Sequence, residues 1–162
     1  MLKAMVTIVM YKPSLKLILI GGGECEQDLR ILIRKLKLSD NVIIMGPMKR
    51  EKLPNLYSES LLGLVPLAFS KAVEYAVPTK LYEYLACGLT FISYGVSKEL
   101  DKLARLYGAG INVNEPTKIA QTVINLLDNP HTIEQMRFNA IKLIENLDKQ
   151  CVKALNNSLE EK

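Results

Sequence analysis

Cysteine and histidine, on which most metal sites and many nucleophilic active sites depend, are scarce in this chain. The 162 residues include three cysteines (Cys25, Cys87 and Cys151) and one histidine, His131. The cysteines are widely spaced and odd in number, so they form neither a metal-ligand pattern nor a disulfide framework, as is typical of a reducing compartment. A zinc site or a Ser-His pair is hard to build from one histidine. We therefore expect no bound metal and a cytoplasmic location.

Long hydrophobic runs are absent as well. Apolar runs such as Leu17 to Ile20 are far shorter than the ~18 residues that a membrane span needs, and the first ten residues carry no small-residue cleavage signature. The sequence therefore predicts a soluble protein without a secretory signal. The sequence has neither a clustered basic arm nor an aromatic platform, so we expect no nucleic-acid partner.

Charge is unevenly distributed along the chain. The net charge is +4, and residues 1–50 hold nine basic and four acidic residues, so they carry +5 and the remainder −1. A basic first third favours a phosphate-bearing ligand or an anionic lipid surface, which leaves peripheral membrane contact open, but an ordinary solvated surface explains it more simply.

Apolar strand-like runs alternate with helical patterns throughout, and no linker or repeat interrupts them. We expect strands at 17–20, 42–45, 61–66, 90–93 and 110–113, and helices near 29–36, 49–57, 78–87, 97–107, 119–127, 133–147 and 148–159. The stretch 2–11 is ambiguous, because Val6 to Val9 have strand propensity in helical surroundings. Strands that are apolar on both faces predict one Rossmann-like α/β domain over residues 1–162, a parallel sheet with helices on both faces. Such sheets bind ligands at the carboxyl ends of their strands.

A glycine loop, Gly21 to Gly23, follows the first of these strands. Its backbone amides could approach a phosphate, but a dinucleotide fingerprint would need a glycine where Glu26 stands, so a nicotinamide cofactor is disfavoured. A tight turn without any ligand explains the loop equally well.

The segment from Glu74 to Gly88 carries more chemistry. Pro78 can begin a helix, which leaves the amides of residues 79–81 free beside the Thr79 hydroxyl and the Lys80 ammonium, a plausible seat for a diphosphate. Glu83 lies one turn later on the same face and could accept hydrogen bonds from the two hydroxyls of a ribose. The alternative is a capped amphipathic helix in which Lys80 and Glu83 form a surface ion pair.

These motifs together resemble the C-terminal, donor-binding domain of GT-B glycosyltransferases, and most of all the retaining enzymes called glycosyltransferase family 4. The resemblance covers nearly the whole chain and is most specific from Pro78 to Gly88. It implies binding of a nucleoside diphosphate sugar, without a metal or other cofactor, and transfer of the sugar with retention of configuration.

The resemblance also implies roles for individual residues. Glu83 matches the ribose-binding carboxylate, and Glu74 matches, one residue out of register, a catalytic glutamate that contacts the donor sugar. The remaining donor-binding matches lie in the glycine loop, near the base and at the helix start: Gly22, Gly23, Pro47, Met48, Thr79, Lys80 and Leu81.

The chain departs from the family by matching only the second of its two domains. The strand that precedes Leu17 in the family, together with the Arg and Lys that neutralise the diphosphate, has no counterpart, unless Val6 to Val9 supply that strand. We therefore expect an isolated chain without transfer activity and a separate chain that carries the N-terminal acceptor domain. Whether the chain belongs to an active enzyme stays open; the alternative is a non-catalytic nucleotide-binding or interaction module on a truncated glycosyltransferase fold.

Overall fold

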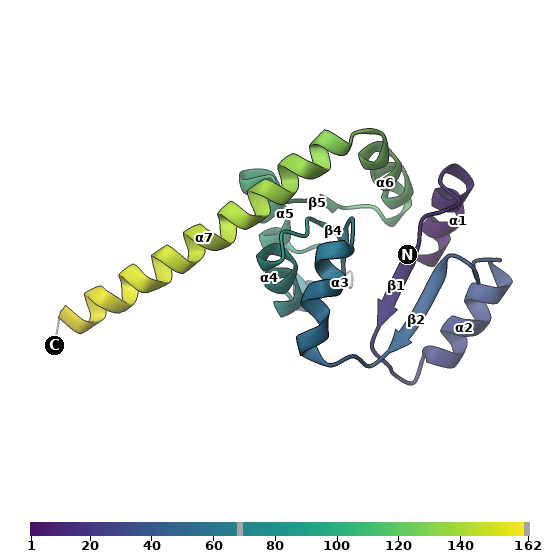
Figure 1. Cartoon of the computed structure of the whole chain (residues 1–162), viewed down its shortest axis with the longest axis horizontal. Coiled ribbons are helices and arrows are strands. Elements are labelled where there is room, and N and C mark those ends of the chain that lie inside the picture. The colour runs from purple at the N-terminus through teal and green to yellow at the C-terminus, as the bar shows by residue number, and fades with distance from the viewer. Residues whose placement is uncertain (68–69, 161–162) are drawn as a thin grey trace. The chain divides into compact units, whose positions relative to one another are not determined.

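The computed structural model describes residues 1–67 and 70–160, and side chains as far as residue 150. The chain divides into two compact units (Figure 1). Unit 1 consists of Met1–Leu53 and Glu115–Asn129, and unit 2 of Pro54–Asn114 and Pro130–Lys162. The single domain over residues 1–162 stays a prediction from the sequence.

Unit 1 contains a two-stranded parallel sheet. Its elements are α1 (Leu2–Tyr11), β1 (Leu17–Ile20), α2 (Glu26–Lys35), β2 (Val42–Gly46), and the 3-10 turns η1 (Arg50–Lys52) and η3 (Pro116–Lys118), followed by α6 (Ile119–Asp128). Strand β1 pairs with β2 so that Leu17 lies opposite Val42, and both side chains are buried. Helix α1 packs against α6, and the Tyr11 hydroxyl donates a hydrogen bond to the Asp128 carboxylate.

The ambiguous stretch 2–11 is the helix α1, so Val6 to Val9 do not form a strand. Leu2, Met5 and Ile8 are buried at a spacing of three residues, which places them on one face of a helix. Burial of this face against α6 outweighs the local strand propensity of Val6 to Val9.

Unit 2 contains a three-stranded parallel sheet. It comprises α3 (Leu53–Glu59), β3 (Gly63–Pro66), η2 (Lys71–Val73), α4 (Thr79–Ala86), β4 (Phe91–Tyr94), α5 (Lys98–Tyr107), β5 (Gly110–Val113) and α7 (Pro130–Glu160). Strand β4 lies between β3 and β5, with Phe91 opposite both Gly63 and Gly110. The core joins the sheet to three helices and is made of Val65, Leu81, Leu85, Phe91, Leu100, Ala109, Ala140 and Leu143.

Helix α7 runs without a break from Pro130 to Glu160, so the separate helix expected at 148–159 is wrong. Pro130 occupies the first position of the helix, where its missing N–H is tolerated, and no proline or glycine follows it before residue 160. The first half of α7 packs on the core of unit 2 through Ala140 and Leu143, which are buried. Among the described residues, no helix is both long and apolar enough to cross a membrane.

The parallel direction of the strands determines where loops gather in each unit. In unit 1, the carboxyl ends of β1 and β2 lead into Gly21–Gly23 and Gly46–Met48. In unit 2, the carboxyl ends of β3, β4 and β5 lead into the segments 67–78, 95–97 and 114. These loops contain most of the predicted site residues, as the ligand-binding rule for such sheets requires.

Candidate functional site

The glycine loop of unit 1 is bound to the end of β2. The Gly21 N–H donates to the Gly46 carbonyl over 2.9 Å, and both glycines have positive φ angles, 121° and 67°. A Cβ on Gly22 would lie 3.6 Å from Pro47 Cγ, which is ordinary contact, whereas one on Gly23 would meet nothing within 4 Å. Unit 1 therefore brings together the predicted residues Gly22 and Pro47, and both Gly22 and Gly23 are exposed.

The charge around this loop opposes a phosphate. Helix α2 starts directly after it, with Glu26 and Asp28 in its first turn and the exposed Glu24 just before. Carboxylates at a helix N-terminus neutralise the positive end of the helix dipole and repel a second anion. We infer that the glycine loop is the weaker of the two phosphate seats that the sequence predicts.

The start of α4 in unit 2 has the opposite character. Pro78 holds an extended backbone (φ −63°, ψ 137°), and the first turn of α4 carries no acidic residue. The Leu81 N–H donates to the Pro78 carbonyl over 2.9 Å, so the predicted set of three free amides is wrong for Leu81. The N–H groups of Thr79 and Lys80 have no hydrogen-bond partner among the residues that the structure describes.

Lys80 is a half-buried cation at this helix start. Burial lowers the pKa of its ammonium, because desolvation disfavours the charged form. Within the described part of the chain, Lys80 makes no ion pair, so the surface pair with Glu83 that the sequence left open does not form. Thr79 is exposed, and Glu83 is half-buried one turn further along the same face. A partly desolvated cation beside two unbonded amides favours an anionic ligand.

The core side of α4 holds this helix start in place. The Leu81 side chain is completely buried, and Leu85 lies one turn later in the same core. The ring of Tyr84 packs edge-on against Tyr57, with centroids 4.9 Å apart, and burial raises the pKa of its hydroxyl to about 12. Leu81 thus anchors the helix, and its side chain has no surface left for a ligand.

Glu74 is bound to a residue that sequence reasoning missed. It lies directly after η2, and its carboxylate forms an ion pair with Lys98 at the start of α5, with 2.6 Å between Oε1 and Nζ. The two residues are 24 positions apart, so no local pattern could have predicted the pair. The only local signal was Ser97, whose hydroxyl caps α5 by accepting the Leu100 N–H.

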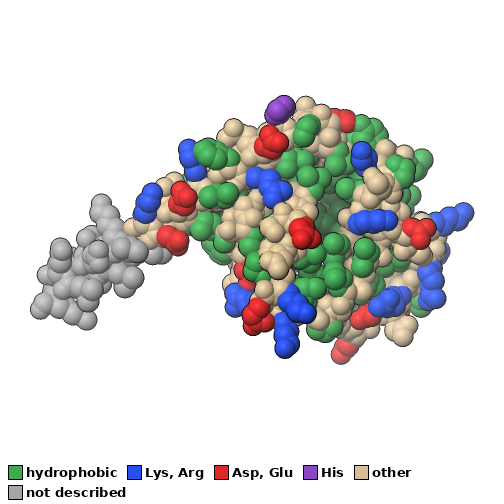
Figure 2. Space-filling view, viewed as in Figure 1, with side chains coloured by type: hydrophobic (Ala, Val, Ile, Leu, Met, Phe, Trp, Pro, Cys, Tyr) green, Lys and Arg blue, Asp and Glu red, His purple; other side chains and the backbone are tan. Residues whose placement is uncertain are grey.

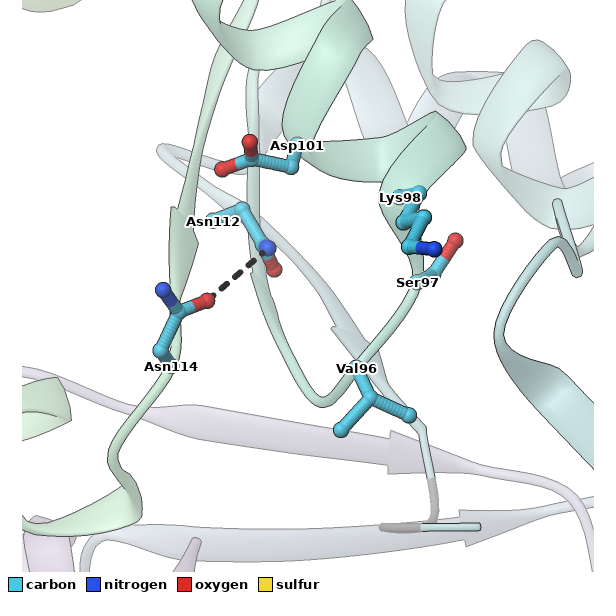
Figure 3. A pocket seen from close by; sticks show the side chains of 6 residues that line it. All are labelled: Val96, Ser97, Lys98, Asp101, Asn112 and Asn114. Carbon is cyan, nitrogen blue, oxygen red and sulfur yellow. Dashed lines mark hydrogen bonds between the residues drawn. The ribbon is translucent and has the colours of Figure 1, made fainter. Parts of the chain in front are cut away.

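A small polar pocket lies between the start of α5 and the end of β5 (Figure 3). It has a volume of about 220 Å³ and is lined by Val96, Ser97, Lys98, Asp101, Asn112 and Asn114. The buried Ser93 hydroxyl donates to Asn112 Oδ1, and Asn112 Nδ2 donates to Asn114 Oδ1, which orients both amides. The pocket is smaller than the ~300 Å³ at which pockets for drug-sized ligands begin. This pocket was not predicted from the sequence.

The surface seen in Figure 2 shows no large basic patch. Lys and Arg side chains are interspersed there with Asp and Glu side chains and with apolar surface. On this face the positive charge of the chain is therefore dispersed, as expected for an ordinary solvated surface.

Comparison with known proteins places the fold. The chain is similar to WaaG, a glycosyltransferase involved in lipopolysaccharide biosynthesis, with 18% identity and a TM-score of 0.74 over 89% of this chain and 38% of that one. HepE (Alr3699) of Anabaena, solved with UDP, is 18% identical with a TM-score of 0.69 over 96% of this chain and 44% of its own. The C-terminal domain of the group 1 glycosyl transferase LpcC from Francisella tularensis is 13% identical, with a TM-score of 0.67 over 90% of this chain and 75% of that one.

The chain thus spans about two fifths of the length of WaaG and HepE. No curated protein sequence matches it significantly. The sequence model of the family described as glycosyl transferases group 1 matches residues 1–143. With the parallel α/β fold of a GT-B C-terminal domain, this chain belongs to the glycosyl transferases group 1.

Proposed function

We propose that this chain is the donor-binding half of a retaining glycosyltransferase, which binds a nucleoside diphosphate sugar and works with an acceptor domain. The observation that carries the proposal is the start of α4. There a half-buried Lys80 ammonium with a lowered pKa lies next to two backbone amides that have no partner among the described residues.

The diphosphate of the donor binds at this helix start. Its negative charge is matched by the Lys80 ammonium, the Thr79 and Lys80 amides and the positive end of the α4 dipole. The same groups stabilise the charge that develops on the departing diphosphate when the bond to the sugar breaks, so they favour transfer by electrostatics rather than by moving a proton.

Two other predicted residues contact the ribose and the sugar of the donor. Glu83, one turn beyond Thr79, accepts hydrogen bonds from the ribose hydroxyls, and Glu74 contacts the sugar. For Gly22, Gly23, Pro47 and Met48, which belong to unit 1, the donor-binding roles stay the predictions that the family resemblance implies. Two structures of one related protein support a nucleotide ligand of this kind, since HepE was solved with UDP and with UDP-glucose.

A thermal-shift titration tests the proposal. The chain is titrated with UDP, GDP, ADP and their glucose esters, in parallel with Lys80→Met and with Lys102→Met, an exposed lysine on α5. A ligand at a hundred times its dissociation constant stabilises the folded chain by about 2.7 kcal/mol, which is readily measured. We expect the nucleotides of one base to raise the melting temperature of the chain. Lys80→Met should reduce this rise, and Lys102→Met should not.

Absence of a shift with every nucleotide would overturn the proposal. A shift without sugar transfer, when the chain is combined with an acceptor-domain chain, would instead favour the non-catalytic nucleotide-binding module.

A further inference from the structure

Two adjacent residues at the start of α5 hold the loop that precedes α4. The hydroxyl of Ser97, which is almost completely buried, donates to the Ala76 carbonyl over 2.8 Å while it caps α5. The Lys98 N–H donates to the Glu74 carbonyl over 2.7 Å. The backbone of the loop is therefore fixed at two points directly upstream of Pro78.

The Lys98 side chain adds a second set of contacts to the same loop. Its ammonium lies 2.6 Å from Glu74 Oε1, donates to the Tyr75 hydroxyl over 3.3 Å, and lies 5.2 Å from the centre of the Tyr75 ring. The hydrogen bond with Glu74 is the main reason that the pKa of Lys98 is raised. Side chain and backbone of one residue thus act together on Glu74.

These contacts have different consequences for the fold and for the Glu74 carboxylate. The Lys98 side chain is 62% exposed and that of Glu74 is 31% exposed, and a pair this open to water contributes little to folding. The bond nevertheless restricts the rotamers of the carboxylate to those that reach Lys98. The backbone bond to Glu74 and the Ser97 cap remain when the Lys98 side chain is changed, so the two contributions can be separated.

We propose that Lys98 is a positioning residue, which aims the Glu74 carboxylate at the sugar of the donor. The inference rests on the proposed function, because it assumes that a nucleotide sugar binds and that Glu74 contacts its sugar. It adds a residue from the start of α5 to the site. Pre-orientation of a ligand-binding side chain reduces the freedom that is lost on binding, and this raises affinity.

The role predicts an effect that depends on the sugar. In Lys98→Met the carboxylate is no longer aimed, so affinity for UDP-glucose falls by about two- to fivefold, the range expected for one exposed ion pair. Affinity for UDP, which has no sugar for Glu74 to contact, changes by less than about twofold on the same reasoning. Lys98→Arg keeps a cation within reach of Glu74 and restores most of the loss.

Calorimetric titration of the whole chain with UDP and UDP-glucose tests this. If another base stabilises the wild type, its diphosphate and glucose ester are used instead. The variants are Lys98→Met, Lys98→Arg, Glu74→Gln, the double variant Lys98→Met/Glu74→Gln, and Lys102→Met as a matched control on the same helix. We expect the double variant to lose no more affinity for UDP-glucose than Glu74→Gln alone, since Lys98 acts through Glu74.

Each contrary result has a distinct meaning. Losses that multiply in the double variant would show that Lys98 contacts the ligand directly, from its place in the polar pocket, and would overturn the positioning role. Equal losses for UDP and UDP-glucose, or no loss, would overturn it too. Failure of the wild type to bind any of the nucleotides would overturn the proposed function first, and this inference with it.

Discussion

Replacing Gly110 by alanine tests the packing of β4 against β5, which determines where the loops of unit 2 lie. The added Cβ would be 2.3 Å from Phe91 Cδ1 and Cε1, whereas ordinary contacts begin at 3.4 Å, so the ring or the strand must move by about 1 Å. Phe91 is completely buried in the core of the unit and cannot yield easily. Overpacking of this kind destabilises by about 1–3 kcal/mol.

An opposing effect must be subtracted from this figure. Replacing glycine by alanine reduces the freedom of the unfolded chain and stabilises by about 0.4–1 kcal/mol where the backbone allows it, as it does at Gly110. Overpacking prevails, and the net loss is about 1–2 kcal/mol. For a chain of this size we expect the melting temperature to fall by roughly 2–8 °C.

Urea unfolding followed by circular dichroism measures the change, with Gly23→Ala as the control. At Gly23 the new Cβ meets nothing within 4 Å, so the control should match the wild type or exceed it slightly. If Gly110→Ala is as stable as the control, Phe91 does not lie over Gly110, and the β4–β5 register described here is wrong.

Three further predictions concern the site and its support. Binding of a diphosphate should raise the lowered pKa of Lys80, because the anion favours the charged ammonium. The affinity of the chain for the diphosphate, measured by calorimetry, should therefore be constant at neutral pH and fall as the pH rises through the pKa that Lys80 has in the free chain. A pH profile of this affinity that Lys80→Met leaves unchanged would contradict this. Glu83→Ala should weaken nucleotide binding by roughly 1–3 kcal/mol, the value of a charged hydrogen bond, and unchanged affinity would remove Glu83 from the site. Thr90→Val should lower the free energy of unfolding in urea by about 1–3 kcal/mol, because the buried Thr90 hydroxyl donates to the Ala109 carbonyl over 2.7 Å; a loss below 0.5 kcal/mol, the range of ordinary surface changes, would argue against that bond.

The sequence predicted those parts of the fold that depend on local patterns. All five strands were expected close to their observed positions, because short apolar runs bounded by glycine or proline leave few alternatives. Pro78 correctly predicted the start of α4, since proline favours the first turn of a helix and cannot lie inside one. The glycine loop was likewise expected, because it directly follows a short apolar run.

Features that depend on distant residues escaped prediction. Residues 2–11 are helical because their buried face packs on α6, more than a hundred positions away. The ion pair between Glu74 and Lys98 forms because β3 and β4 are neighbours in the sheet, which brings the segments after them together. The loss of the Leu81 amide from the predicted diphosphate seat is a matter of turn geometry that residue types alone do not reveal.

A nuclear magnetic resonance titration tests the central claim, that a nucleoside diphosphate binds at the start of α4. Backbone amide resonances of the labelled chain are followed as the nucleotide that stabilises it is added. We predict that the amides of Thr79 and Lys80 shift most within unit 2, and that Lys80→Met abolishes these shifts at the same concentration. Shifts that leave residues 79 and 80 unaffected, or no shifts with UDP, GDP or ADP, would contradict the account.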